Sequence, residues 1–91
     1  MSLRKGDKVK WASNGRLKHG IVQAVVPAKD NPRLHLRKDL SLRQIKFSGS
    51  NANYTRYIVA VPRGGQSELA DYYCPKPGAL EVDSDEESVM T

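Results

Sequence analysis

Two stretches of alternating polar and apolar residues flank an Asn-Gly pair near the start of the chain. Lys8 to Ala12 precedes Asn14-Gly15, and Leu17 to Val26 follows it and becomes β-branched in its later half. A two-residue Asn-Gly turn joins antiparallel strands because both of its central residues adopt a positive φ. Gly20 inside the second stretch predicts a bulge or a close approach of the backbone. The sequence therefore predicts a hairpin whose long second strand ends at Pro27.

Short apolar runs separated by proline and glycine predict three more strands. Tyr57 to Val61 and Glu68 to Tyr73 flank a Pro-Arg-Gly-Gly-Gln turn, and Ala79 to Val82 alternates after a Pro-Lys-Pro-Gly corner. Five short strands with turn signals between them predict an all-β fold, a small five-stranded antiparallel barrel. The 91 residues have the length of one domain, which we place at residues 1–82.

Residues 29–53 form an inserted segment or long loop between the second and third strands. Asn31 before Pro32 is the pattern of a capped helical turn. Against a helix, the apolar residues from Leu34 to Phe47 recur mostly at intervals of two, which favours extended structure. We therefore expect Arg43 to Ser48 to pair with the strand that begins near Tyr54, with a single helical turn at Pro32 as the open alternative.

The net charge of +5 is the difference between unlike parts of the chain. Residues 1–56 carry thirteen basic and three acidic residues, a balance of +10, and residues 57–80 are neutral. The last eleven residues carry five acidic residues and no basic one. Residues 83–91 contain too few apolar residues to pack, which predicts a disordered acidic tail. This tail is either a solubilising terminus or a segment that folds back over the basic body and competes with a polyanion.

Both ends of the chain resemble a known family. The run from Lys5 to Trp11, then Gly15-Arg16, then Gly20-Ile21-Val22, resembles the opening of SH3-like barrels of the KOW and Tudor-like kinds, and Pro77 to Val82 is similar to the end of hypervirulence-associated Tudor-like domains. The resemblance leaves out residues 29–53 and implies an SH3-like barrel. That fold hosts RNA binders, transcription elongation factors, methyl-lysine readers and accessory subunits of enzymes, so the residues must indicate the function.

The basic residues predict a face that contacts the phosphates of RNA or DNA. Strand alternation places Val9 and Trp11 in the core and Lys8 and Lys10 in solvent, and the cations of the next strand come within cross-strand reach. The same alternation in the insertion would place Arg33, His35 and Arg37 opposite the leucines. A stripe of this kind binds phosphates with a strong salt dependence. The predicted contacts are Lys8, Lys10, Arg16, Lys18, Arg33, Arg37, Lys38 and Arg43.

The aromatic residues offer platforms on which unpaired bases stack. Trp11 is expected in the core, which leaves Tyr54, Tyr72 and Tyr73 as the stacking candidates. A methyl-ammonium cage is a third class of site, and it requires converging rings with a nearby carboxylate. Asp71 beside Tyr72 is the only pairing in the sequence that suggests such a cage.

A protein-interaction module, an accessory subunit or inhibitor that docks on an acidic partner protein, is the alternative function. In that case the insertion would present an apolar strip with a cationic rim. The strip would consist of Leu34, Leu36, Leu40 and Leu42.

Catalytic and metal-binding patterns are weak in this sequence. His19 and His35 lie far apart, and Cys74 precedes a proline instead of heading a helix. We therefore expect a non-enzymatic protein without metal or cofactor. The chain has neither a long apolar run nor an apolar leader, which predicts a cytoplasmic protein with no membrane partner.

Overall fold

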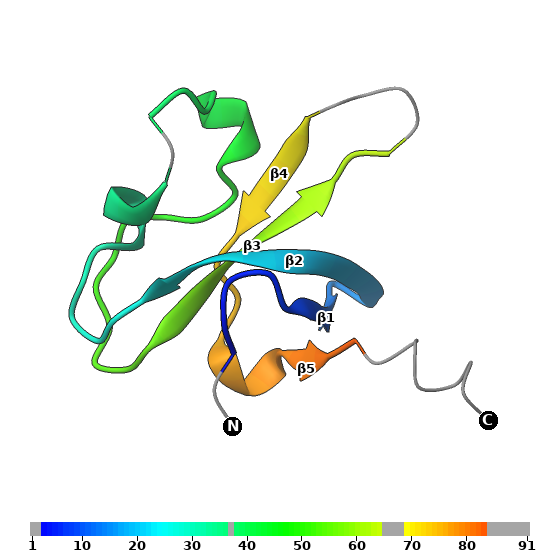
Figure 1. The fold of residues 1–91 in the computed structure, drawn as a ribbon, viewed down its shortest axis with the longest axis horizontal. Coiled ribbons are helices and arrows are strands. Elements are labelled where there is room, and N and C mark those ends of the chain that lie inside the picture. The colour runs from blue at the N-terminus through cyan, green and yellow to red at the C-terminus, as the bar shows by residue number, and fades with distance from the viewer. Residues whose placement is uncertain (1–2, 37, 65–68, 84–91) are drawn as a thin grey trace.

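A computed structural model of the chain describes residues 3–36, 38–64 and 69–83. The five strands in these ranges form a single antiparallel sheet (Figure 1). Its strands are β1 (Lys8–Ser13), β2 (Arg16–Val26), β3 (Arg56–Pro62), β4 (Ala70–Tyr73) and β5 (Glu81–Val82), in the order β4-β3-β2-β1-β5. The chain meanders through four strands and then returns, so that β5 pairs with β1. The prediction of an all-β fold with five antiparallel strands is confirmed. β4 and β5 are the two edges of the sheet, and the barrel is not closed between them.

The β1–β2 hairpin has the predicted turn. Asn14 has a φ of 53° and Gly15 a φ of 77°, the pair of positive values that a type I′ turn requires. The two-residue turn pairs Ser13 with Arg16 and fixes the register of the whole hairpin. The close approach expected at Gly20 is also present, since a Cβ built there would lie 2.5 Å from Val59 Cγ1. The β-bulge itself lies further along β2, around Gln23.

One face of the sheet carries the first core. Val9, Trp11, Val22 and Val59 project from three neighbouring strands and are buried together. Further apolar residues from β3, from β4 and from the segments before β1 and β5 also belong to this core. These are Leu3 among the buried residues and Tyr57, Val61, Tyr73 and Leu80 among the partly buried ones.

The opposite face of the same sheet carries a second core. Its buried members are Val26, Ile58, Ala60 and Tyr72. Ile58 and Val59 are consecutive residues with no exposed surface, so β3 is apolar on both faces. Among the residues that pack against the second core are Leu36, Leu40 and Phe47 from the insertion, which lies on the left in Figure 1. The insertion therefore covers the face of β3 and β4 that carries the second core, which we call the outer face of the sheet.

The insertion is built from short helical turns, which corrects the expectation of a strand at residues 43–48. A 3-10 turn, η1 (Pro32–His35), is capped by Asn31, so the alternative left open at Pro32 is the one that occurs. A second turn, η2 (Leu42–Gln44), follows Ser41, whose side chain forms a capping box with Gln44. Among the described residues of the insertion, only Ile45 makes a β-bridge, and its partner is Tyr72 of β4.

A buried arginine attaches the insertion to the sheet. Arg56 at the start of β3 is 8% exposed. Its Nη1 donates a hydrogen bond to the main-chain oxygen of Ser50 at 2.8 Å, and its Nη2 donates to the main-chain oxygen of Asp30 at 3.0 Å. Asp30 and Ser50 lie near the two ends of the insertion, so one guanidinium holds both ends in place.

The last described residues follow a third turn, η3 (Pro77–Ala79), and extend the sheet at β5. Asp83, which we assigned to the acidic tail, has a defined place, because its main-chain N–H donates to the oxygen of Lys8 at 2.9 Å. Residues 84–91 lie outside the described part of the chain, so the disorder expected there stays a prediction. No helix in the described ranges has the length and apolar character needed to cross a membrane.

Candidate nucleic-acid interface

The register of the hairpin separates the predicted basic residues onto two faces. Residues that pair directly across antiparallel strands project their side chains to the same side. Lys10 pairs with His19, whereas Trp11 pairs with Lys18. Lys8 and Lys10 therefore lie on the outer face, and Arg16 and Lys18 lie on the face of Trp11. This separation corrects the expectation that the cations of the two strands form one surface.

Carboxylates from β5 lie beside the outer-face lysines. Glu81 pairs directly with Lys10 across β1 and β5. Asp83 follows next to Lys8, and its Oδ2 lies 2.9 Å from Nδ1 of His19. Cross-strand pairs of opposite charge offset one another. The outer face of the hairpin is therefore less positive than the sequence of β1 alone indicates.

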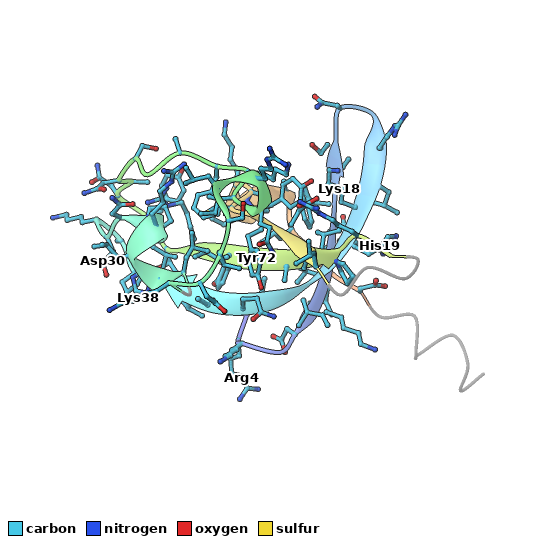
Figure 2. All side chains as sticks on the ribbon, turned by 90° about the horizontal axis from the view of Figure 1, so that it is seen from above. Arg4, Lys18, His19, Asp30, Lys38 and Tyr72 are labelled. Atoms are coloured by element: carbon cyan, nitrogen blue, oxygen red, sulfur yellow. The ribbon has the colours of Figure 1, made fainter. Side chains whose placement is uncertain are left out.

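The predicted cations of the insertion do not continue a stripe from the hairpin. Arg33 donates from Nη2 to the main-chain oxygen of Phe47 at 3.1 Å and so helps to fold the insertion. Lys38 and Arg43 are exposed. In Figure 2, Lys38 and Lys18 lie toward opposite ends of the molecule. Arg37 lies outside the described residues.

A small hollow lies at the Trp11 face of the hairpin, between β1, β4 and the insertion. Its volume is about 170 Å³. The edge-to-face pair of Trp11 and Tyr73, with ring centroids 5.6 Å apart, forms part of its wall. Nζ of Lys18 lies 5.0 Å from the centroid of the Tyr73 ring. We call this site the aromatic hollow, and its lining residues are Trp11, Ser13, Lys46, Phe47, Tyr73, Cys74 and Pro75.

The β-bridge at the edge of β4 brings the insertion to this hollow. Ile45 pairs with Tyr72, and the main-chain N–H of Lys46 donates to the oxygen of Tyr72 at 2.8 Å. This contact places Lys46 and Phe47 beside Tyr73. On the hairpin side, Arg16 pairs directly with Ser13, another lining residue. Residues from three distant parts of the sequence thus meet at one site.

The structure distinguishes the three tyrosines that we predicted as stacking platforms. Tyr73 lines the aromatic hollow and is half-buried. Tyr72 is 7% exposed and belongs to the second core, which corrects its assignment as a stacking residue. Tyr54 is exposed but does not line the hollow. Lys46 and Phe47 were missed, because only the bridge to β4 reveals that they adjoin Tyr73.

The charges around the aromatic hollow favour an anionic ligand that carries a ring. Lys46 lines it and Lys18 lies over Tyr73, while no aspartate or glutamate of the described residues lines it. Asp71, which precedes Tyr72 and Tyr73, forms an ion pair with Arg63 at 2.8 Å. A methyl-ammonium cage needs a carboxylate to balance its cationic ligand. Three aromatic rings do line the hollow, but the charged residues beside them are lysines, which suit an anionic ligand and not a cationic one.

A larger hollow near the sheet has a different character. It measures about 410 Å³ and is lined by Leu3, Tyr57, Pro77, Leu80, Glu81 and Val82. Its only charged lining residue is an acid, so this apolar hollow does not attract phosphate. Among the described residues, no group of three or more His, Cys, Asp and Glu side chains is arranged to hold a metal ion.

The four leucines expected to form an apolar strip on the insertion do not share one environment in the structure. Leu36 and Leu40 are half-buried against the second core. Leu34 is 80% exposed and Leu42 is 75% exposed. Two of the four leucines therefore attach the insertion to the sheet, and the other two are exposed on its surface.

Cys74 provides a chemical probe of the aromatic hollow. Burial raises the pKa of its thiol, and the nearby positive charge of Arg56 opposes that shift to a smaller extent. Because the thiolate is the reactive form, iodoacetamide at pH 8 should alkylate native Cys74 several-fold more slowly than Cys74 in urea. Mass spectrometry of timed samples measures both rates, and equal rates would show that the thiol is not shielded.

No protein-family model matches this sequence, and searches of curated proteins and of solved structures found no match either. The geometry and charge of the aromatic hollow therefore carry the functional conclusion.

Proposed function

We propose that this protein is a non-enzymatic binder of RNA or DNA that contacts phosphates through the cations around the aromatic hollow. The observation that carries the proposal is the Lys18 ammonium over Tyr73, beside Trp11 and Lys46, at a site lined by no described carboxylate. Cations neutralise phosphates, and aromatic rings accept base faces, so both parts of a nucleotide have a matching group. A cytoplasmic location is part of the same proposal.

The proposal also includes an SH3-like barrel of the KOW and Tudor-like kinds. The return of β5 to β1 supports it, because a small barrel needs its last strand beside its first. The bulge in β2 supports it as well, because a bulge bends a long strand as a small barrel requires. Such barrels serve many functions, so the fold adds nothing to the choice of ligand.

The hairpin offers a matched pair of variants for testing the interface. Lys18→Met and Lys10→Met remove the same charge and keep a flexible apolar side chain, but they act on opposite faces of the hairpin. We expect Lys18→Met to weaken binding of an oligonucleotide about 5-fold near 0.1 M salt, because one phosphate contact contributes about 0.7 to the salt slope of a single strand. Lys10→Met should have a smaller effect, since Glu81 already lies opposite Lys10.

Fluorescence anisotropy with a labelled oligonucleotide at several salt concentrations measures both the affinity and the slope. The slope should decrease by about 0.7 for Lys18→Met. An affinity of the natural protein that does not change with salt would refute the proposed function. Equal losses for both lysine variants would contradict the assignment of the interface to the face of the hairpin that carries Trp11 and Lys18.

A further inference from the structure

We infer that the aromatic hollow takes one unpaired base, so that the preferred ligand is single-stranded nucleic acid. This inference rests on the proposed function and specifies its ligand class. Its starting point is the composition of the site, in which three rings and two cations come together from β1, β2, β4 and the insertion. Rings alone would suit many apolar ligands, and cations alone would suit any polyanion. Their combination is what a nucleotide with an exposed base requires.

The size of the hollow limits what enters it. At about 170 Å³ it is smaller than the roughly 300 Å³ at which sites for drug-sized ligands begin. One ring system fits such a space, and the rest of a polymer must stay outside. Lys46 lines the hollow and Lys18 lies over the ring of Tyr73, so both cations are available to the phosphates that flank the inserted base. A single strand provides this arrangement at every nucleotide.

A duplex does not provide it, because its bases are paired and stacked on one another. Among the described residues, the basic side chains that could follow a duplex backbone are also divided, since the register of the hairpin places Lys8 and Lys10 on the face opposite to Arg16 and Lys18. Recognition of unpaired bases by stacking on aromatic rings is the common solution for single strands. The described geometry therefore favours a single strand over a duplex.

The chain contains a built-in reporter for base insertion. Trp11 is the only tryptophan, and it lines the aromatic hollow. Trp11 is 5% exposed and its ring packs against that of Tyr73, so a base that enters the hollow alters the surroundings of the indole and should quench its fluorescence. Binding through phosphates alone leaves the ring untouched, so tryptophan emission separates the two modes of binding.

Three probes of about 8 nucleotides test the inference on the full chain. They are a thymidine strand, an abasic strand with the same phosphates, and a duplex of equal length. We expect the thymidine strand to bind about 5- to 150-fold more tightly than the abasic strand, the range that one stacked base contributes. Only the thymidine strand should quench Trp11.

Two ring-removing variants provide the matched control. Phe47→Leu removes a ring from the aromatic hollow and keeps an apolar side chain against the second core. Tyr54→Leu removes an exposed ring that does not line the hollow. Phe47→Leu should abolish most of the preference for the thymidine strand over the abasic strand, whereas Tyr54→Leu should retain it. Circular dichroism and thermal melting confirm that both variants are folded.

The outcomes separate this inference from the proposed function. Equal, salt-dependent binding of the thymidine and abasic strands would overturn base insertion and leave the phosphate-binding function standing. Tighter binding of the duplex would overturn the single-strand preference. No salt-dependent binding of any probe would refute the proposed function and the inference together. Loss of the preference in Tyr54→Leu but not in Phe47→Leu would overturn the assignment to the aromatic hollow.

Discussion

Replacing Gly20 with alanine should lower the free energy of unfolding by about 3 kcal/mol, the upper end of the usual cost of overpacking. The added Cβ would lie 2.5 Å from Val59 Cγ1 and 2.6 Å from the main-chain oxygen of Ala60. The valine methyl has little freedom in a packed core. The oxygen belongs to β3, which pairs with β2, so it cannot move without disturbing the ladder.

Gly78→Ala is the control for this prediction. A Cβ at Gly78 would meet nothing within 4 Å, and the residue needs no positive φ. Both alanine substitutions lower the conformational entropy of the unfolded chain by a similar amount, which stabilises the folded protein by up to about 1 kcal/mol. The difference between the two variants therefore isolates the clash in the folded state. Urea unfolding followed by Trp11 emission measures both, and equal midpoints would contradict the close approach of β2 and β3.

Replacing Ile58 with alanine should cost about 3 to 4 kcal/mol of unfolding free energy, within the range for large aliphatic residues in cores. Ile58 has no exposed surface and belongs to the core that Leu36, Leu40 and Phe47 cover. Its loss should therefore loosen the insertion before the rest of the sheet unfolds. Limited trypsin digestion should show early cuts within residues 27–55 of this variant.

Val59→Ala is the neighbouring control, because Val59 is equally buried but faces the first core. At a matched fraction of unfolded protein, its tryptic cuts should be spread over β1, β2 and the insertion alike. A preference for cuts in the insertion in both variants would show that the two cores do not unfold separately. Mass spectrometry of the early fragments provides the comparison.

Local chemistry predicts the hairpin well, because the Asn14-Gly15 turn is determined by the two residues themselves. The same turn also implies the register, since a two-residue loop pairs residue 13 with residue 16 and residue 11 with residue 18. The placement of Lys18 and Lys10 on opposite faces of the hairpin could therefore have been predicted from the sequence, because the turn determines which residues pair.

The insertion was harder to predict because two local signals compete there. Leucines at intervals of two favour a strand, whereas Ser41 and Gln44 have the spacing of a capping box. The capping box forms, and Gln44 Nε2 also donates to the main-chain oxygen of Ala70 at 2.9 Å. That second contact depends on the edge of β4, which lies 26 residues away. The aromatic hollow could not be assembled from the sequence for the same reason.

The guanidinium of Arg56 has a role that other small domains give to a bound metal ion. Small domains with limited cores often use a metal or a disulfide to organise irregular segments. Here the guanidinium of Arg56, on β3, donates hydrogen bonds to the main-chain oxygens of Asp30 and Ser50, much as a metal ion binds its oxygen ligands. Chelators remove a metal ion and reductants break a disulfide, but neither reagent breaks the hydrogen bonds of an arginine. The order of the insertion is thereby tied to the integrity of the sheet, because the arginine that holds both of its ends is carried on β3.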